Sequence, residues 1–348
     1  MKVAVFLPNW IGDVVMATPT LRSLRKHFGP RATIIGIQRP YVQDVLGDTK
    51  WLDDVIEFDP KSSLGFGNFK LIRELRRRKI ETAILLPNSA RVALIAWAAG
   101  IPERIGYVRY GRGPLLTEKL FPPRSGRKFT PISAIDYYLE LSKVFDNSNN
   151  DTRVELGTDA KCESVASDFW DRHQLNEQHV VALNTGGAYG AAKSWPDEYF
   201  AELANRLANK TKHRIVVVCG PNEKDAAENI VALSEHPNVI SLAAQELSIG
   251  LTKSVIKRCS LLISTDSGPR FFGAAFDVPT ISLFGPTDPR WAKSHHPLAV
   301  DLHVDVPCGP CGKRVCPLSH HRCMRDISVD DVFDTAMNLL TTSNRNVA

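Results

Sequence analysis

The chain has 348 residues, of which 43% are hydrophobic and 23% are charged, and this length allows two domains of ordinary size. It contains no run of 18 apolar residues, so we expect no membrane-spanning helix. Trp10 and Asp13 interrupt the apolar N-terminal segment, which we interpret as a buried strand rather than a signal peptide. These features predict a soluble, cytoplasmic protein.

The net charge of +5 is unevenly distributed. Residues 61–130 contain 15 Lys and Arg but 4 Asp and Glu, a balance of +11, so the rest of the chain sums to −6. This segment fits an anionic partner such as a phosphorylated glycolipid, a membrane surface or nucleic acid, and it also fits a solvated helix face. Aromatic residues are spaced too irregularly among the cations to indicate a nucleic-acid platform. The cations that could face an anionic partner include Arg104, Arg109, Arg112, Arg124, Arg127 and Lys128.

Apolar and amphipathic segments alternate along the first part of the chain. Continuous apolar runs predict buried parallel strands at residues 3–8, 33–37, 55–58 and 82–87, and an amphipathic pattern predicts a helix at 69–80. The stretch 145–153 is rich in Asn and Asp, and we interpret it as an interdomain linker.

The alternation restarts after the linker, with strands predicted at 180–184, 214–220, 239–242, 261–265 and 280–285 and helices at 197–209, 223–235 and 330–342. Two such runs predict an α/β protein of two doubly wound, Rossmann-like domains facing a central cleft. We expect the domains to span residues 1–150 and 151–327, with the C-terminal helix 328–348 as a candidate to pack back on the first. Ligands of such folds bind beyond the carboxyl ends of the strands.

Several common motifs are absent from the sequence. There is no G-x-x-x-x-G-K-[ST] loop, no G-x-G-x-x-G after the first strand and no G-x-S-x-G elbow. A bound nucleotide must therefore be held in another way.

Asp13 follows the first strand, after a glycine that allows a tight turn. A carboxylate at this helix start can stabilise the helix terminus, or it can accept a proton from a hydroxyl group. Both interpretations remain open on position alone.

A glycine-rich loop follows the first strand of the second domain. Gly186 and Gly187 let the backbone approach a ligand, Thr185 adds a hydroxyl donor, and Lys193 adds a charge suited to a diphosphate. A flexible turn with an exposed lysine explains the same residues.

The fourth strand of this domain runs into a tight turn at Asp266, Ser267 and Gly268, followed by a helix lined with small residues. The N-terminal amides of such a helix can bind an anion. Asp266 could orient a neighbouring group or cap the helix.

Together these segments resemble the ADP-heptose:lipopolysaccharide heptosyltransferases, a family of inverting GT-B glycosyltransferases. The W-I-G-D-V-V segment, the G-x-x-x-x-A-K-x-W-P loop, the T-D-S-G turn and the L-F-G-P-T-D-P segment occur in family order over nearly the whole chain. The similarity is greatest to the heptosyltransferase II-like branch.

The resemblance implies a donor, ADP-L-glycero-D-manno-heptose, held by the second domain, and a lipopolysaccharide inner-core acceptor met by the first. It implies Asp13 as general base, Lys193 beside the donor phosphates and Glu223 near the nucleoside. It places Asp266, Ser267 and Gly268 around the phosphates and sugar. It implies contact with the inner face of the inner membrane, no cofactor for catalysis and no nucleic-acid partner.

One position departs from the family pattern D-S-G-x-x-H, since Phe271 stands where the histidine is expected. A phenyl ring neither donates a hydrogen bond nor carries charge. The departure keeps two alternatives open: a GT-B enzyme that uses another nucleotide sugar, and a nucleotide-sugar-binding protein without turnover.

Four of the seven cysteines cluster near the C-terminus as Cys308, Cys311, Cys316 and Cys323, with His320 and His321 between the last two. In a cytoplasmic protein this spacing is typical of a structural zinc site, and reduced thiols, a disulfide or an iron–sulfur cluster are the alternatives. We expect the cluster to lie apart from the transfer chemistry.

Overall fold

The computed structural model describes residues 1–59, 66–145, 150–176, 179–187 and 189–345. The chain forms two compact units, residues 1–157 with 290–293, and residues 158–289 with 294–348. We call them the first and second domains. No helix among the described residues is long and apolar enough to cross a membrane.

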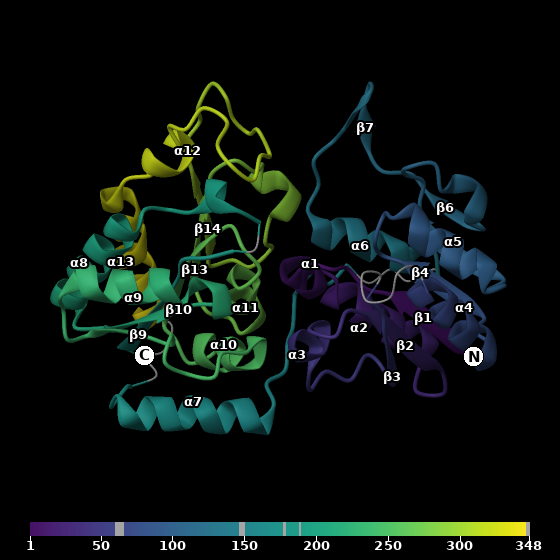
Figure 1. Ribbon diagram of the computed structural model, residues 1–348, viewed down its shortest axis with the longest axis horizontal. Coiled ribbons are helices and arrows are strands. Elements are labelled where there is room, and N and C mark those ends of the chain that lie inside the picture. Colours follow the sequence, from purple (N-terminus) through teal and green to yellow (C-terminus); the bar gives the residue numbers. More distant parts are fainter. Residues whose placement is uncertain (60–65, 146–149, 177–178, 188, 346–348) are drawn as a thin grey trace. The chain divides into compact units, whose positions relative to one another are not determined.

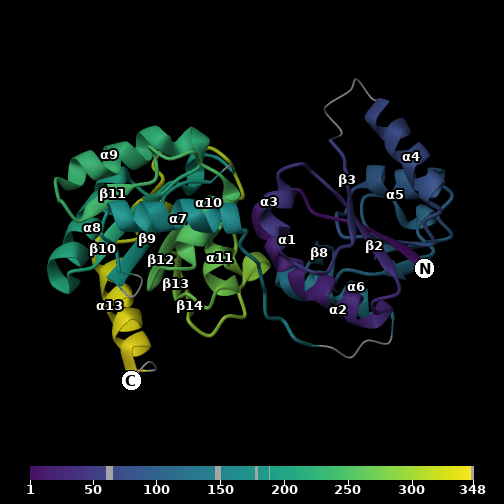
Figure 2. The ribbon, with the colours of Figure 1, turned by 90° about the horizontal axis from the view of Figure 1, so that it is seen from below.

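The first domain is built on a six-stranded parallel sheet of order β3-β2-β1-β4-β5-β6. Figure 2 shows α2 and α6 on one side of this sheet and α4 and α5 on the other. Its strands are β1 (Lys2–Phe6), β2 (Thr33–Gln38), β3 (Asp54–Glu57), β4 (Thr82–Leu85), β5 (Glu103–Tyr107) and β6 (Glu118–Leu120), followed by the hairpin β7 (Arg124–Ser125) and β8 (Lys128–Phe129). Its helices are α1 (Ile11–Met16), α2 (Thr18–Phe28), α3 (Val42–Leu46), α4 (Phe66–Arg78), α5 (Ala90–Ala98) and α6 (Ala134–Lys143), with the short 3₁₀ helix η1 (Gly113–Leu115).

The second domain repeats this plan with strand order β11-β10-β9-β12-β13-β14, also parallel. Its strands are β9 (Val180–Asn184), β10 (Arg214–Val218), β11 (Val239–Ser241), β12 (Leu261–Thr265), β13 (Thr280–Phe284) and β14 (Ala299–His303). Its helices are α7 (Ala160–Arg172), α8 (Asp197–Thr211), α9 (Lys224–Ser234), α10 (Ile249–Ile256), α11 (Arg270–Ala275), α12 (Arg322–Arg325) and α13 (Val329–Arg345). The 3₁₀ helices η3 (Ala191–Lys193), η4 (Pro221–Glu223) and η5 (Pro289–Ala292) complete the element order. The predicted α/β fold with two doubly wound sheets is confirmed.

The boundary between the domains lies seven residues beyond the expected position of 150/151. Arg22 of α2 holds the intervening segment to the first domain through ion pairs with Asp151 and Glu155, at 3.0 and 2.8 Å. The amide of Glu155 also donates to Thr18 Oγ1. Residues 146–149 of the predicted linker lie outside the described residues.

The C-terminal helix α13 belongs to the second domain, whereas we expected it as a candidate to pack on the first. Its apolar face, with Val332, Ala336 and Leu340, is buried in the core of the second domain, where α13 packs on α8 (Figure 1). The indole of Trp195 donates to the carbonyl of Ile327 just before the helix, at 3.0 Å. The segment that rejoins the first domain is instead 290–293, and the carbonyl of Lys293 accepts from Ser133.

Candidate active site

The loops of the second domain meet at the carboxyl edge of its sheet, because β9, β12 and β13 are neighbouring parallel strands. Asn184 at the end of β9 donates through Nδ2 to Ser264 Oγ at 2.8 Å and to Ser267 Oγ at 2.7 Å. Thr265 at the end of β12 donates to the carbonyl of Gly186 at 3.0 Å. These hydrogen bonds join the glycine-rich loop to the 265–268 turn, which lie side by side because β9 and β12 are neighbouring strands.

Gly186 has no room for a side chain, since a Cβ there would lie 2.0 Å from Glu223 Cδ. The Glu223 carboxylate therefore lies against the backbone of the glycine loop. Its Oε2 accepts from the amide of Gly220 at 2.7 Å, which fixes it at the end of β10. At Gly187 a Cβ would lie 3.0 Å from the Cβ of Ser267. The structure thus brings together Glu223, the glycines and Ser267.

Lys193 forms an ion pair with Asp266, with Nζ 2.5 Å from Oδ2 and 3.0 Å from the Asp266 carbonyl oxygen. Both side chains are largely buried, at 13% and 10% exposure. The ammonium also lies 4.4 Å from the centre of the Tyr189 ring. Thr287 Oγ1, from the loop after β13, donates to the same Oδ2 at 2.6 Å. Asp266 therefore orients Lys193 instead of simply capping a helix.

Arg270 lies beneath this pair, in the core of the domain. Its side chain is almost fully buried, its Nε lies 3.6 Å from Asp266 Oδ1, and its Nη1 lies 3.2 Å from Ser282 Oγ. Burial lowers the pKa of Arg270, against the opposing effect of Asp266 and Asp301. Arg270 supports the turn at Asp266 from within the core, and because its guanidinium is buried it is not available to a ligand.

Phe271, at the position of the family histidine, is also buried, with the Arg270 guanidinium 4.1 Å from its ring centre. It belongs to the hydrophobic core. The helix that was expected to bind an anion through its N-terminal amides, α11, has six residues. The amides of Phe271 and Phe272 donate to the carbonyls of Gly268 and Pro269.

Thr185 is buried at the end of β9, and its hydroxyl has no hydrogen-bond partner among the residues that the structure describes. A buried hydroxyl without a partner costs free energy, so its position at the ligand-binding edge of the sheet favours a role in binding.

Asp13 lies in the first turn of α1 and is half-buried. Trp10 occupies the N-cap position, so Asp13 is not the cap, although its charge still complements the helix dipole. Tyr138 of α6 donates a side-chain hydrogen bond to Asp13, and burial together with this carboxylate raises the pKa of Tyr138 well above its usual value. The phenol therefore stays protonated and acts as a donor. Sequence analysis missed Tyr138, since nothing in the sequence links positions so far apart.

The cysteine cluster does not form the expected metal site. All four thiols are free, and Cys308 and Cys311 are exposed. In the part of the chain that the structure describes, no three His, Cys, Asp or Glu side chains are arranged to hold a metal ion. Cys308 Sγ lies 3.9 Å from His320 Nε2. Burial, together with the nearby thiols of Cys311, Cys308 and Cys316, raises the pKa of Cys323.

The segment that carries the cysteines is nevertheless attached to the glycine-rich loop, contrary to the expectation that it lies apart. Tyr189 donates through its hydroxyl to the carbonyl of Gly312 at 2.5 Å, and the amide of Ala192 donates to the carbonyl of Arg314 at 3.0 Å. A Cβ at Gly190 would lie 2.5 Å from the Arg314 carbonyl oxygen. The segment buttresses the loop that presents Lys193.

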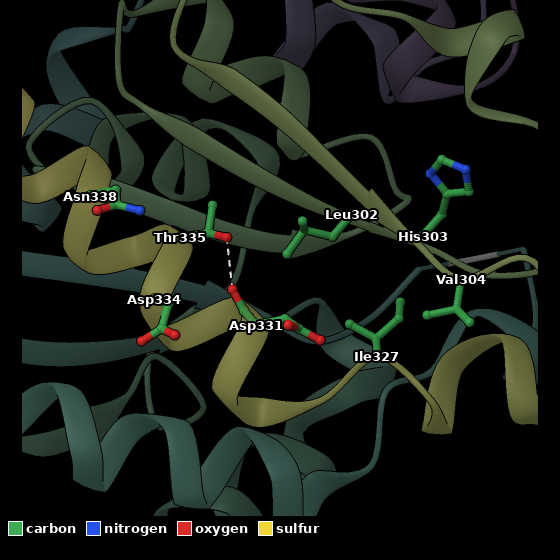
Figure 3. Close-up of a pocket in the computed structure, with 8 residues that line it drawn as sticks. All are labelled: Leu302, His303, Val304, Ile327, Asp331, Asp334, Thr335 and Asn338. Atoms are coloured by element: carbon green, nitrogen blue, oxygen red, sulfur yellow. Dashed lines mark hydrogen bonds between the residues drawn. The ribbon is translucent and has the colours of Figure 1, made fainter.

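A pocket of about 300 Å³ lies elsewhere in the second domain, between the end of β14 and α13 (Figure 3). Thr335 donates to the carbonyl of Asp331 within α13 beside it. None of the predicted site residues lines this pocket. Its lining residues are Leu302, His303, Val304, Ile327, Asp331, Asp334, Thr335 and Asn338.

Comparison with known proteins agrees with the fold. A model of the glycosyltransferase family 9 (heptosyltransferase) matches residues 68–321. Lipooligosaccharide heptosyltransferase 2 of Campylobacter jejuni is 25% identical over 352 residues, with 99% of this chain and 100% of that protein covered.

Two solved structures share the fold. A family 9 glycosyl transferase from Veillonella parvula superposes with a TM-score of 0.82 at 24% identity, covering 98% of this chain and 97% of the other. The ADP-heptose LPS heptosyltransferase II of E. coli superposes with a TM-score of 0.78 at 22% identity, covering 99% and 100%.

Proposed function

Because this chain belongs to glycosyltransferase family 9 (heptosyltransferase), we propose that it transfers a heptose from ADP-L-glycero-D-manno-heptose to the inner core of lipopolysaccharide. The observation that carries the donor side is the buried Lys193–Asp266 pair beside the glycine-rich loop. A cation held in this way is preorganised to stabilise the negative charge of a departing diphosphate. The names of the heptosyltransferase relatives support the choice of sugar and acceptor.

We assign the nucleoside side of the donor to Glu223 and the phosphates to Lys193, Thr185 and the backbone of the glycine loop. Gly186 and Gly187 keep this loop free of side chains where it meets Glu223 and Ser267. Asp266, Ser267 and Gly268 form the turn that holds the loop and faces the sugar. On this assignment no cofactor is required for transfer, because the Lys193 ammonium supplies the positive charge.

Asp13 is the proposed general base. It accepts the proton of the acceptor hydroxyl while that oxygen attacks the anomeric carbon and ADP leaves with the bonding electrons. This single displacement inverts the anomeric configuration and passes through an oxocarbenium-like transition state. Tyr138 orients the carboxylate by its hydrogen bond. Since the acceptor is a membrane glycolipid, the enzyme works as a cytoplasmic protein in peripheral contact with the inner face of the inner membrane.

The test is transfer from ADP-heptose to an inner-core acceptor that lacks heptose. Asp13→Asn should lower kcat by about 10²–10⁴-fold, the range for loss of a general base, with ADP binding unchanged. Lys193→Gln should weaken ADP binding as well as turnover. Proton NMR of the product should show the inverted anomer.

Full activity of Asp13→Asn would overturn the assignment of the base. Absence of turnover in the wild type despite ADP binding would support another sugar, another acceptor, or a binding protein without turnover.

A further inference from the structure

Residues 108–130 of the first domain follow β5, and we call this segment the arm. The chain passes through η1, pairs β6 with β5, and extends into the β7–β8 hairpin. Figure 1 shows β7 well away from β1, β2 and β4 of the sheet.

The base of the arm is fixed by Arg112, which is fully buried. Its guanidinium donates to the carbonyls of Tyr107 and Pro87 and to Asn88 Oδ1, and so joins the arm to the ends of β4 and β5. Burial lowers its pKa to about 10, which leaves it charged at neutral pH. The arm is therefore a rooted element of the fold.

The hairpin is held to this base by Phe129. The guanidinium of Arg109 lies 4.0 Å from the centre of the Phe129 ring, and that of Arg124 lies 4.4 Å from it. Two cations on one ring give a defined position to the hairpin and concentrate positive charge along it.

The outer surface of the arm combines exposed aromatic rings with cations. Phe121 is 73% exposed and Tyr110 is 72% exposed. Glu118 at the start of β6 is the one acidic residue of the arm, and no Asp or Glu occurs between residues 119 and 135. None of the exposed cations of this surface takes part in an ion pair with another described residue, and they are Lys119, Arg124, Arg127 and Lys128.

Helix α4 offers a contrasting surface in the same domain. Phe69 is 71% exposed and lies among cations, but Glu74 stands in the middle of the helix and pairs with Arg77 and Arg78. The Glu74 carboxylate reduces the attraction of this face for an anionic partner. The exposed fraction of Phe69 nevertheless matches those of Phe121 and Tyr110 in the arm.

We propose that the arm docks the protein on the surface of an anionic lipid bilayer, with its cations on lipid phosphates and with Phe121 and Tyr110 in the headgroup region. Aromatic rings favour the membrane–water interface, and each Lys or Arg close to an anionic surface strengthens partitioning about fivefold. The biological purpose rests on the proposed function, in which the acceptor is a membrane lipid, but the binding itself does not.

The experiment is sedimentation of the full-length protein with vesicles of phosphatidylcholine, alone or mixed with phosphatidylglycerol. Wild type should partition onto the mixed vesicles and not onto the neutral ones. The variant Lys119→Gln/Arg127→Gln/Lys128→Gln, which leaves Arg124 on the Phe129 ring, should partition at least about tenfold more weakly. The matched control Lys70→Gln/Arg73→Gln/Lys79→Gln removes the same charge from the α4 region and should stay close to wild type.

A second pair of variants tests the contribution of the aromatic rings, because Phe121 and Phe69 are exposed to nearly the same extent. Phe121→Ser should weaken partitioning onto the anionic vesicles, and Phe69→Ser should not. Equal losses of partitioning in the arm and α4 variants would overturn the proposal in favour of nonspecific charge attraction. Failure of the wild-type protein to bind anionic vesicles would also overturn it. Far-UV circular dichroism and the thermal unfolding midpoint of each variant verify that it is folded. Because vesicle binding requires no turnover, its failure is distinguishable from failure of the proposed function.

Discussion

The two domains share a strand order but use the ends of their strands differently. In the second domain the strand ends are locked to one another, through Asn184 with Ser264 and Ser267 and through Lys193 with Asp266. In the first domain Asp13 stands on a six-residue helix, and Tyr138 is its donor. Lys119, Arg124, Arg127 and Lys128 of this domain are exposed.

This difference fits the proposed division of labour, with the donor on the second domain and the acceptor on the first. A site for a donor of fixed structure benefits from preorganised donors and charges, because these stabilise a transition state without rearrangement. A large acceptor carried by a membrane requires an accessible base and a surface that finds the membrane. Three changes test this comparison, from the largest expected effect to the smallest.

Asp266→Ala should destabilise the second domain by about 3–5 kcal/mol, because it leaves both Lys193 and Arg270 buried without their shared carboxylate. Denaturant unfolding measures the change. The control is Asp301→Ala, which also removes a carboxylate 3.6 Å from Arg270 but one that is more exposed, at 23%. Equal costs for the two changes would contradict the central role of Asp266.

Tyr138→Phe should lower kcat about tenfold, the cost of one hydrogen bond to a charged group, and should move the acidic limb of the pH–rate profile to higher pH. The direction follows because a hydrogen bond to a carboxylate favours its ionised form. Tyr137→Phe is the control, since its hydroxyl donates to Asn88. A profile that stays unshifted would limit Tyr138 to a packing role.

Replacement of Cys308, Cys311, Cys316 and Cys323 by serine should have the smallest effect, below about 1 kcal/mol, because the thiols are free and partly or fully exposed. Thermal unfolding and transfer activity measure it. Unfolding of this variant, or of the wild type with a chelator, would show that the cluster binds a metal ion in solution.

Much of the fold could be predicted from the sequence, because buried parallel strands are continuous apolar runs. The edge strand β14 was missed, and so were β5 and β6, whose sequences mix charged and apolar residues at positions that remain partly exposed. The domain boundary was misplaced because the ion pairs of Arg22 join segments more than a hundred residues apart.

The donor site was predicted as a set of loops, but the partners of its residues were not. Strand order alone places Gly186 near Asp266. That a single carboxylate serves Lys193, Arg270 and Thr287 depends on side-chain packing, which no sequence pattern encodes. The same limit explains why the sequence shows Phe271 at the position of the family histidine but not that its ring is buried.

The hydrogen bonds from Tyr189 and Ala192 to residues 312 and 314 make the donor loop and the cysteine-bearing segment one unit of local stability. If the cysteine-bearing segment unfolds locally, the loop loses these two hydrogen bonds. If a ligand binds the loop, the free energy of that local unfolding rises by the free energy of binding. Local unfolding and donor occupancy are therefore linked equilibria, and the loaded enzyme protects a part of its chain that the donor need never touch.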